Sequence, residues 1–108
     1  MEDVLLKLGQ VLSDRRSESA GSSYVASLYQ AGLDKILKKL GEEAAETIIA
    51  AKNGTVEPLV HEVADLWFHS LVLLAYMDLG PDAVLAELER RFGRSGLEEK
   101  AARPQGPA

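Results

Sequence analysis

Apolar residues recur at every third or fourth position through most of the chain, the spacing that places them on one face of an α-helix. Near the N-terminus this spacing is formed by Val4, Leu5, Leu8, Val11 and Leu12. The pattern predicts four main helices, at about residues 2–16, 34–52, 58–79 and 81–92, and a short helix at 24–30. Aromatic residues are only 6 % of the composition. Both features favour an all-α fold over a β-rich one.

Turn-forming residues separate the predicted helices. Serine and glycine are frequent in residues 17–23, and Gly80 precedes Pro81 at the last helix boundary. Asn53 and Gly54 stand between the two longest helices. Helices joined by so short a turn must pack antiparallel as a hairpin. The sequence therefore predicts an antiparallel bundle of about four helices.

The length of the chain indicates a single domain. Its 108 residues can form one core, although short helices of this kind often need a partner subunit to cover them. We predict a domain over residues 1–103 and a short irregular tail over 104–108. Glycine, proline and charged residues follow Gly93, so we expect no regular structure beyond it.

Composition excludes several classes of protein. There is no cysteine, which excludes disulfides and thiolate chemistry, and the net charge of −5 opposes nonspecific binding to nucleic acid. The acidic N-terminus does not resemble a signal peptide. The apolar run at residues 71–76 is shorter than the roughly 20 residues that span a membrane. We expect a cytoplasmic protein without nucleic-acid or membrane partners.

Two acidic clusters carry the candidate chemistry. Residues 42–46 read Glu-Glu-Ala-Ala-Glu and residues 62–65 read Glu-Val-Ala-Asp. Within each cluster, two carboxylates lie three positions apart and share a helix face. Facing each other across a hairpin, these carboxylates would repel unless a cation lay between them, and Mg²⁺ prefers such oxygen ligands. The predicted ligands of Mg²⁺, for which Mn²⁺ can substitute, are Glu43, Glu46, Glu62 and Asp65.

Acidic pairs are also common on exposed helices, where they only improve solubility. Here the carboxylates of both pairs border apolar side chains on the same helix face. Such a border is not expected on a fully solvated surface. Gly41 adds to the functional interpretation, because a glycine inside a helix costs about 1 kcal/mol relative to alanine. Its position before Glu42 indicates a close approach to the backbone, and close packing of two helices is the alternative.

The same residues closely resemble a known family. Residues 35–46 read Lys-Ile-Leu-Lys-Lys-Leu-Gly-Glu-Glu-Ala-Ala-Glu, and residues 62–69 read Glu-Val-Ala-Asp-Leu-Trp-Phe-His. They resemble the phosphoribosyl-ATP pyrophosphohydrolases of histidine biosynthesis, which are related to the all-helical MazG-like nucleoside triphosphate pyrophosphohydrolases. Residues 21–24 (Gly-Ser-Ser-Tyr) and 95–100 (Ser-Gly-Leu-Glu-Glu-Lys) extend the resemblance, which covers about residues 4–103.

Two departures from the family pattern leave the carboxylates untouched. Ala102 stands where the family often has serine, so no hydroxyl role can be assigned there. Trp67 and Phe68 stand where leucine and tyrosine are frequent, which removes a phenol but keeps the bulk.

The resemblance implies Mg²⁺-dependent hydrolysis of phosphoribosyl-ATP to phosphoribosyl-AMP and pyrophosphate. The implied catalytic residues are Glu42, Glu43, Glu46, Glu62 and Asp65. Metal held by the last four would neutralise the triphosphate and lower the pKa of an attacking water. Glu42 lies to one side, where it would hold a second ion or position the water, unless it is only an exposed helix charge.

Basic and aromatic residues are candidates for binding the substrate. Lys35 and Lys39 lie one or two turns before Glu43 on nearly the same face, so their charges can meet the phosphates. The resemblance adds Tyr24, from the matched segment 21–24. The candidates for the additional ribose phosphate are Arg15, Arg16, Lys100 and Arg103. For each of these four, simple surface charge is the alternative.

Two further expectations concern neighbours of the site. His69 follows Asp65 by one helical turn, where it would donate a hydrogen bond to that residue, or else be a core or interface histidine. Residues 71–75 are apolar nearly all round, which predicts a homodimer that buries this helix. The alternatives to the biosynthetic enzyme are a housecleaning pyrophosphohydrolase for free nucleotides and a noncatalytic helical dimerisation module.

Overall fold

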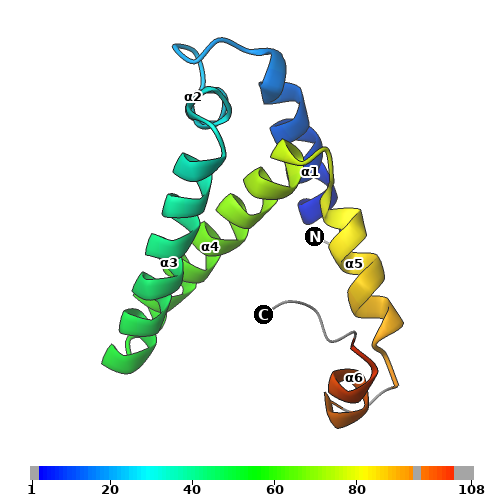
Figure 1. Cartoon of the computed structure of the whole chain (residues 1–108). Coiled ribbons are helices and arrows are strands. Elements are labelled where there is room, and N and C mark those ends of the chain that lie inside the picture. Colours follow the sequence, from blue (N-terminus) through cyan, green and yellow to red (C-terminus); the bar gives the residue numbers. More distant parts are fainter. Residues whose placement is uncertain (1–2, 94–95, 104–108) are drawn as a thin grey trace.

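The computed structural model describes residues 3–93 and 96–103, and this part of the chain is helical without strands (Figure 1). A 3₁₀ turn, η1 (Arg15–Ser17), follows the first helix. The helices are α1 (Val4–Asp14), α2 (Tyr24–Ala31), α3 (Leu33–Asn53), α4 (Val56–Tyr76), α5 (Pro81–Arg90) and α6 (Gly96–Ala102). The predicted all-α class is confirmed for the described residues.

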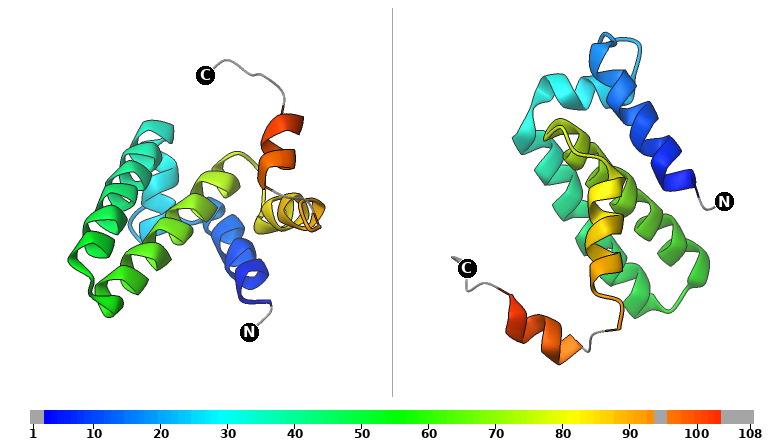
Figure 2. Two further views of the ribbon diagram at one scale, coloured as in Figure 1. Left: turned by 90° about the horizontal axis from the view of Figure 1, so that it is seen from below. Right: turned by 90° about the vertical axis from the view of Figure 1, so that its right-hand side faces the viewer.

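The two longest helices, α3 and α4, form an antiparallel hairpin and lie side by side in Figures 1 and 2. Gly54 ends α3 with a φ of 74°, in the left-handed region that glycine adopts without steric cost. Pro58 lies in the first turn of α4, where its missing N–H has no intrahelical partner to lose. The predicted hairpin is therefore confirmed.

The core lies at the end of the hairpin that is far from Gly54. Its most deeply buried side chains come from α1, α2, α3 and α4 and are Leu12, Leu28, Ile36 and Val72. Towards the Gly54 turn the hairpin is less covered, because α1 and α2 do not extend that far. Ile48 and Ile49 of α3 and Val60 of α4 are exposed there. The acidic clusters lie between these two regions.

Helix α6 corrects the expectation of irregular structure beyond Gly93. Gly93 has a φ of 82° and ends the preceding turn, after which Gly96–Ala102 forms a helix. Residues 97–102 are good helix formers, and glycine and proline occur only around this short segment. The sequence pattern was dominated by those flanking residues. The predicted tail at 104–108 lies outside the described residues.

The apolar segment 71–75 is covered only in part by the chain itself, because Leu73 and Leu74 are half-buried. The expected homodimer that buries this helix therefore stays a prediction. Leu71, Val72 and Ala75 are all buried in the core. The exposed apolar side chains of α4 lie outside this segment and include Val60 and Trp67.

Gly41 makes no close approach within the chain. A Cβ atom at this position would have nothing within 4 Å, apart from its own helix and immediate neighbours. Both the backbone approach and the close helix packing expected from the sequence are therefore absent among the described residues. Gly41 lies on the exposed side of α3.

Helix α4 (Val56–Tyr76) matches the helix predicted at about residues 58–79, although it ends at Tyr76. By length and composition alone it could cross a membrane, a test that core helices of soluble proteins also pass. It packs against α1 and α3 and has Glu62 and Asp65 near its middle. Only 22 % of its apolar window is buried within the described chain.

Candidate active site

The most deeply buried carboxylate of the site is Glu43, in the middle of α3. It is only 7 % exposed, and its Oε1 lies 2.5 Å from Nδ1 of His69 on α4, which is 5 % exposed. Burial raises the pKa of the Glu43 carboxyl above its usual range, while His69 acts in the opposite direction. The His69 Nδ1 is also 3.1 Å from the backbone carbonyl of Asp65. Thus His69 joins the two acidic helices.

A second pair of carboxylates meets across the hairpin. A hydrogen bond between the carboxyl groups of Glu46 and Glu62 raises the pKa of Glu62, and partial burial and the charge of Asp65 raise it further. The Oε2 atom of Glu62 is buried, yet no described residue hydrogen-bonds to it. Oε1 of Glu43 is likewise buried without a hydrogen bond from the described residues, although Nδ1 of His69 is 2.5 Å away.

Asp65 has a neighbour that the sequence reasoning missed. Nε2 of His61 lies 3.2 Å from Oδ2 of Asp65. Ligand atoms of His61, Glu62 and Asp65 all lie within 4.8 Å of one another. The signal was present in the sequence, since His61 precedes Asp65 by four positions and so shares its helix face.

These donors fit a divalent cation. Carboxylates that crowd together and buried oxygens without partners both cost free energy that a cation between them would offset. Glu43, Glu46, Glu62 and Asp65 could supply the oxygen ligands, and His61 a nitrogen. Of the four predicted ligands, Glu62 and Asp65 lie within ligand reach of His61. Glu43 is close enough to Asp65, and Glu46 to Glu62, for each to influence the other's pKa or protonation. That all four bind one cation stays a prediction.

Comparison with known proteins shows the family of this chain. The family model described as phosphoribosyl-ATP pyrophosphohydrolase matches residues 5–92. The chain belongs to this family. A Methylococcus capsulatus protein named phosphoribosyl-ATP pyrophosphatase is 62 % identical over 104 residues, which cover 96 % of this chain and 99 % of the relative. A protein of the same name from Geobacter metallireducens is 57 % identical, covering 96 % and 95 %.

The two lysines that precede the acidic cluster on α3 differ in their exposure to solvent. Lys35 is exposed, whereas Lys39 is half-buried. The charge of Lys39 is close enough to lower the pKa values of Tyr24 and Glu43, against the larger effect of burial on each. Among the described residues it forms no ion pair, so the charge of Lys39 faces the site without a carboxylate partner.

His69 and Tyr24 are in contact, which the sequence analysis did not predict. The Tyr24 hydroxyl lies 2.9 Å from Nε2 of His69. The expected donation from His69 to Asp65 is made to its backbone carbonyl, and the side chain that His69 contacts is that of Glu43. Glu42 is exposed beside this group.

The other basic residues proposed to bind the substrate do not lie beside the carboxylates. Lys100 and Arg103 belong to α6 and its end, which lie apart from the α3–α4 hairpin in Figures 1 and 2. Arg16 donates to the Ala75 carbonyl at 2.9 Å and pairs with Asp78, while Arg15 pairs with Glu18 at 3.0 Å. Arg15 and Arg16 therefore stabilise the fold, and the single chain does not bring any of the four to the carboxylates.

Proposed function

We propose that this chain hydrolyses phosphoribosyl-ATP to phosphoribosyl-AMP and pyrophosphate in histidine biosynthesis, in the cytoplasm. The observation that carries the proposal is the meeting of Glu46 with Glu62, whose Oε2 is buried without a partner in the described chain, within a member of the phosphoribosyl-ATP pyrophosphohydrolase family. Mg²⁺, or Mn²⁺ in its place, is the cation that this donor set would hold.

The acidic residues of the site have two roles in the proposed reaction. Glu43, Glu46, Glu62 and Asp65 bind the cation. When bound, the cation supplies charge neutralisation of the triphosphate and a water of lowered pKa. Glu42, which is exposed beside the cluster, orients the attacking water or holds a second cation.

The phosphates of the substrate need positive charge from the chain as well. Lys39, and Lys35 one turn earlier, supply it on the same side of α3. The Tyr24 ring is 51 % exposed at the edge of the site and offers a surface to the substrate. Lys100 and Arg103 reach the ribose phosphate only if α6 of a second subunit, or a rearranged α6, approaches the hairpin.

A substrate panel tests the proposed activity. With Mg²⁺ present, we expect rapid release of equal amounts of pyrophosphate and phosphoribosyl-AMP from phosphoribosyl-ATP, and at least about a hundredfold lower kcat/KM with ordinary dNTPs, which is roughly 2.7 kcal/mol of discrimination. Preference for dNTPs would instead indicate a housecleaning enzyme. No Mg²⁺-dependent hydrolysis of any nucleotide would indicate a noncatalytic helical module.

Lys39→Met separates phosphate binding from metal binding. The substitution keeps the aliphatic stem and removes the charge, so we expect kcat/KM to fall about tenfold or more, as for loss of a charged hydrogen bond. The affinity for Mn²⁺, measured by electron paramagnetic resonance, should hardly change. Lys38→Met, at the exposed neighbouring position, is the matched control and should behave as wild type. Altered Mn²⁺ affinity with normal catalysis at saturating metal would assign Lys39 to Glu43 instead.

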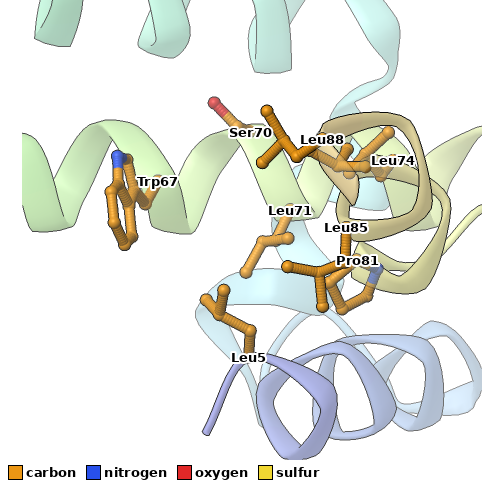
Figure 3. A pocket seen from close by; sticks show the side chains of 9 residues that line it. Leu5, Trp67, Ser70, Leu71, Leu74, Pro81, Leu85 and Leu88 are labelled. Carbon is orange, nitrogen blue, oxygen red and sulfur yellow. The ribbon is translucent and has the colours of Figure 1, made fainter. Parts of the chain in front are cut away.

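We also propose that the enzyme is a homodimer, whose interface includes α4, as the sequence suggested, together with α5. An apolar groove of about 290 Å³ lies between α1, α4 and α5 (Figure 3). Trp67, Leu85 and Leu88 line it and are 58 %, 38 % and 46 % exposed. Ser70 is its only polar lining residue within the described chain.

A second copy of the chain is the occupant that fits this groove. A small-molecule pocket usually has several polar groups that fix the ligand, whereas this groove is lined almost entirely by apolar side chains. One more of these, Val84 on α5, is 43 % exposed. Apolar surface of this extent on neighbouring helices is typical of a subunit interface.

A further inference from the structure

Tyr24, His69 and Glu43 form a line of contacts that leads into the site. The Tyr24 hydroxyl is 2.9 Å from Nε2 of His69, and Nδ1 of the same ring is 2.5 Å from Oε1 of Glu43. We infer that Tyr24 and His69 are positioning residues that hold the Glu43 carboxylate in its ligating orientation. The inference rests on the proposed function, in which Glu43 is a metal ligand.

The partners of His69 determine where its proton lies. On the Nδ1 side the ring meets two oxygen acceptors, the carboxylate of Glu43 and the backbone carbonyl of Asp65. A carbonyl cannot donate, so Nδ1 must carry the proton. The hydroxyl of Tyr24 can then donate to the unprotonated Nε2 of the neutral ring. Tyr24 thus fixes the tautomer that His69 presents to Glu43.

The His69 ring is held firmly enough to act as a positioning group. It is 5 % exposed, and the rings of Phe68 and Tyr24 contact it edgewise, with centroids 5.2 Å and 5.9 Å away. Both of its nitrogens are engaged by protein atoms, so it does not coordinate a cation itself. Its remaining action on the site is through Glu43 and the Asp65 backbone.

Helix α2 explains how Tyr24 reaches a residue 45 positions later in the chain. Tyr24 is the first residue of α2, directly after Ser23, whose hydroxyl caps the helix by accepting from the Ala26 N–H at 3.2 Å. The other end of α2 is anchored by the Tyr29 hydroxyl, which donates to the Leu12 carbonyl at 2.8 Å. The helix therefore places the Tyr24 hydroxyl against Nε2 of His69, whereas Glu43 contacts Nδ1 of the same ring.

The tautomer can be measured without metal or substrate. Nitrogen-15 NMR of the metal-free protein should show that the neutral His69 ring carries its proton at Nδ1 and not at Nε2. In Tyr24→Phe, the Nε2 signal should shift because its hydrogen bond is lost. Protonation of His69 mainly at Nε2 in wild type would overturn the inference, whatever the enzyme hydrolyses.

Two substitutions of His69 test the positioning role itself. Asparagine places an amide near Nδ1 and can keep the contact with Glu43, whereas glutamine places it near Nε2 and can keep only the contact with Tyr24. Loss of an outer partner of a metal ligand typically weakens metal affinity by about 10–100-fold. We expect that loss of Mn²⁺ affinity in His69→Gln and a smaller loss in His69→Asn, with circular dichroism confirming that both metal-free variants are folded.

The same assay distinguishes positioning from substrate binding by Tyr24. Tyr24→Phe, which keeps the aromatic ring, should weaken Mn²⁺ binding several-fold, and saturating metal should restore most of the lost activity. A raised KM with unchanged Mn²⁺ affinity would overturn the inference, as would equal losses in the two His69 variants. The wild-type protein can also show the expected tautomer and yet neither bind Mn²⁺ nor hydrolyse phosphoribosyl-ATP. In that case the proposed function and the positioning role are both wrong. The tautomer assignment alone would then be correct.

Discussion

Glu62→Gln is expected to reduce Mg²⁺-dependent hydrolysis by at least about a hundredfold, since loss of a metal ligand removes several kcal/mol of charge stabilisation in the transition state. The protein should nevertheless remain folded. Glu62 hydrogen-bonds to Glu46, which raises its pKa, and glutamine can donate to Glu46 permanently as a protonated Glu62 would. The metal-free variant should therefore melt at the same temperature as wild type or slightly higher.

Metal-dependent stability gives a second readout of the same substitution. A ligand that binds only the folded state raises the melting temperature, so millimolar Mg²⁺ should stabilise wild type and stabilise Glu62→Gln much less. Glu57→Gln is the matched control, because Glu57 lies on the same helix, α4, in its exposed first turn. The control should keep both activity and the response to Mg²⁺. An active Glu62→Gln enzyme would refute the assignment of this residue.

Leu88→Asp is expected to dissociate the proposed homodimer. Leu88 lies on α5 and lines the apolar groove, which has no carboxylate among its described lining residues (Figure 3). A charge buried in an apolar interface without a partner costs several kcal/mol, which raises the dissociation constant by about a hundredfold or more. Sedimentation velocity at micromolar concentration should show a dimer for wild type and monomers, or unfolded chains, for the variant.

Val11→Asp is the control for this substitution. Val11 is 44 % exposed, compared with 46 % for Leu88, but it does not line the groove. The same charge at the same exposure should leave the dimer intact if the groove is the interface. A wild-type protein that sediments as a folded monomer at this concentration would contradict the dimer proposal outright.

Local signals in the sequence were sufficient for the helices and the acidic cluster. The apolar period gave the long helices, and the short turn at Gly54 allowed only an antiparallel hairpin. Once α3 and α4 were paired, the three-residue spacing of the carboxylates within each helix placed Glu46 opposite Glu62. These features depend on neighbours in sequence and on one short connection, so periodicity was enough to predict them.

Features that depend on distant contacts were not accessible in the same way. The meeting of Tyr24 with His69 requires the position of α2 over the hairpin, and the role of Arg16 requires the approach of η1 to the end of α4. Likewise, the burial of Val72 depends on how α1 and α2 cover α4. Apolar periodicity shows that one face of a helix is buried. It does not show whether that face is buried within the same chain or against a second subunit.

The location of a bound cation tests the central claim most directly. Crystals grown with Mn²⁺, at a concentration that supports hydrolysis, should show an anomalous scattering peak between α3 and α4. The peak should lie about 2 Å from carboxylate oxygens of Glu43, Glu46, Glu62 and Asp65, as expected for direct coordination. Full hydrolytic activity at that Mn²⁺ concentration, with no peak at these four carboxylates, would contradict the account.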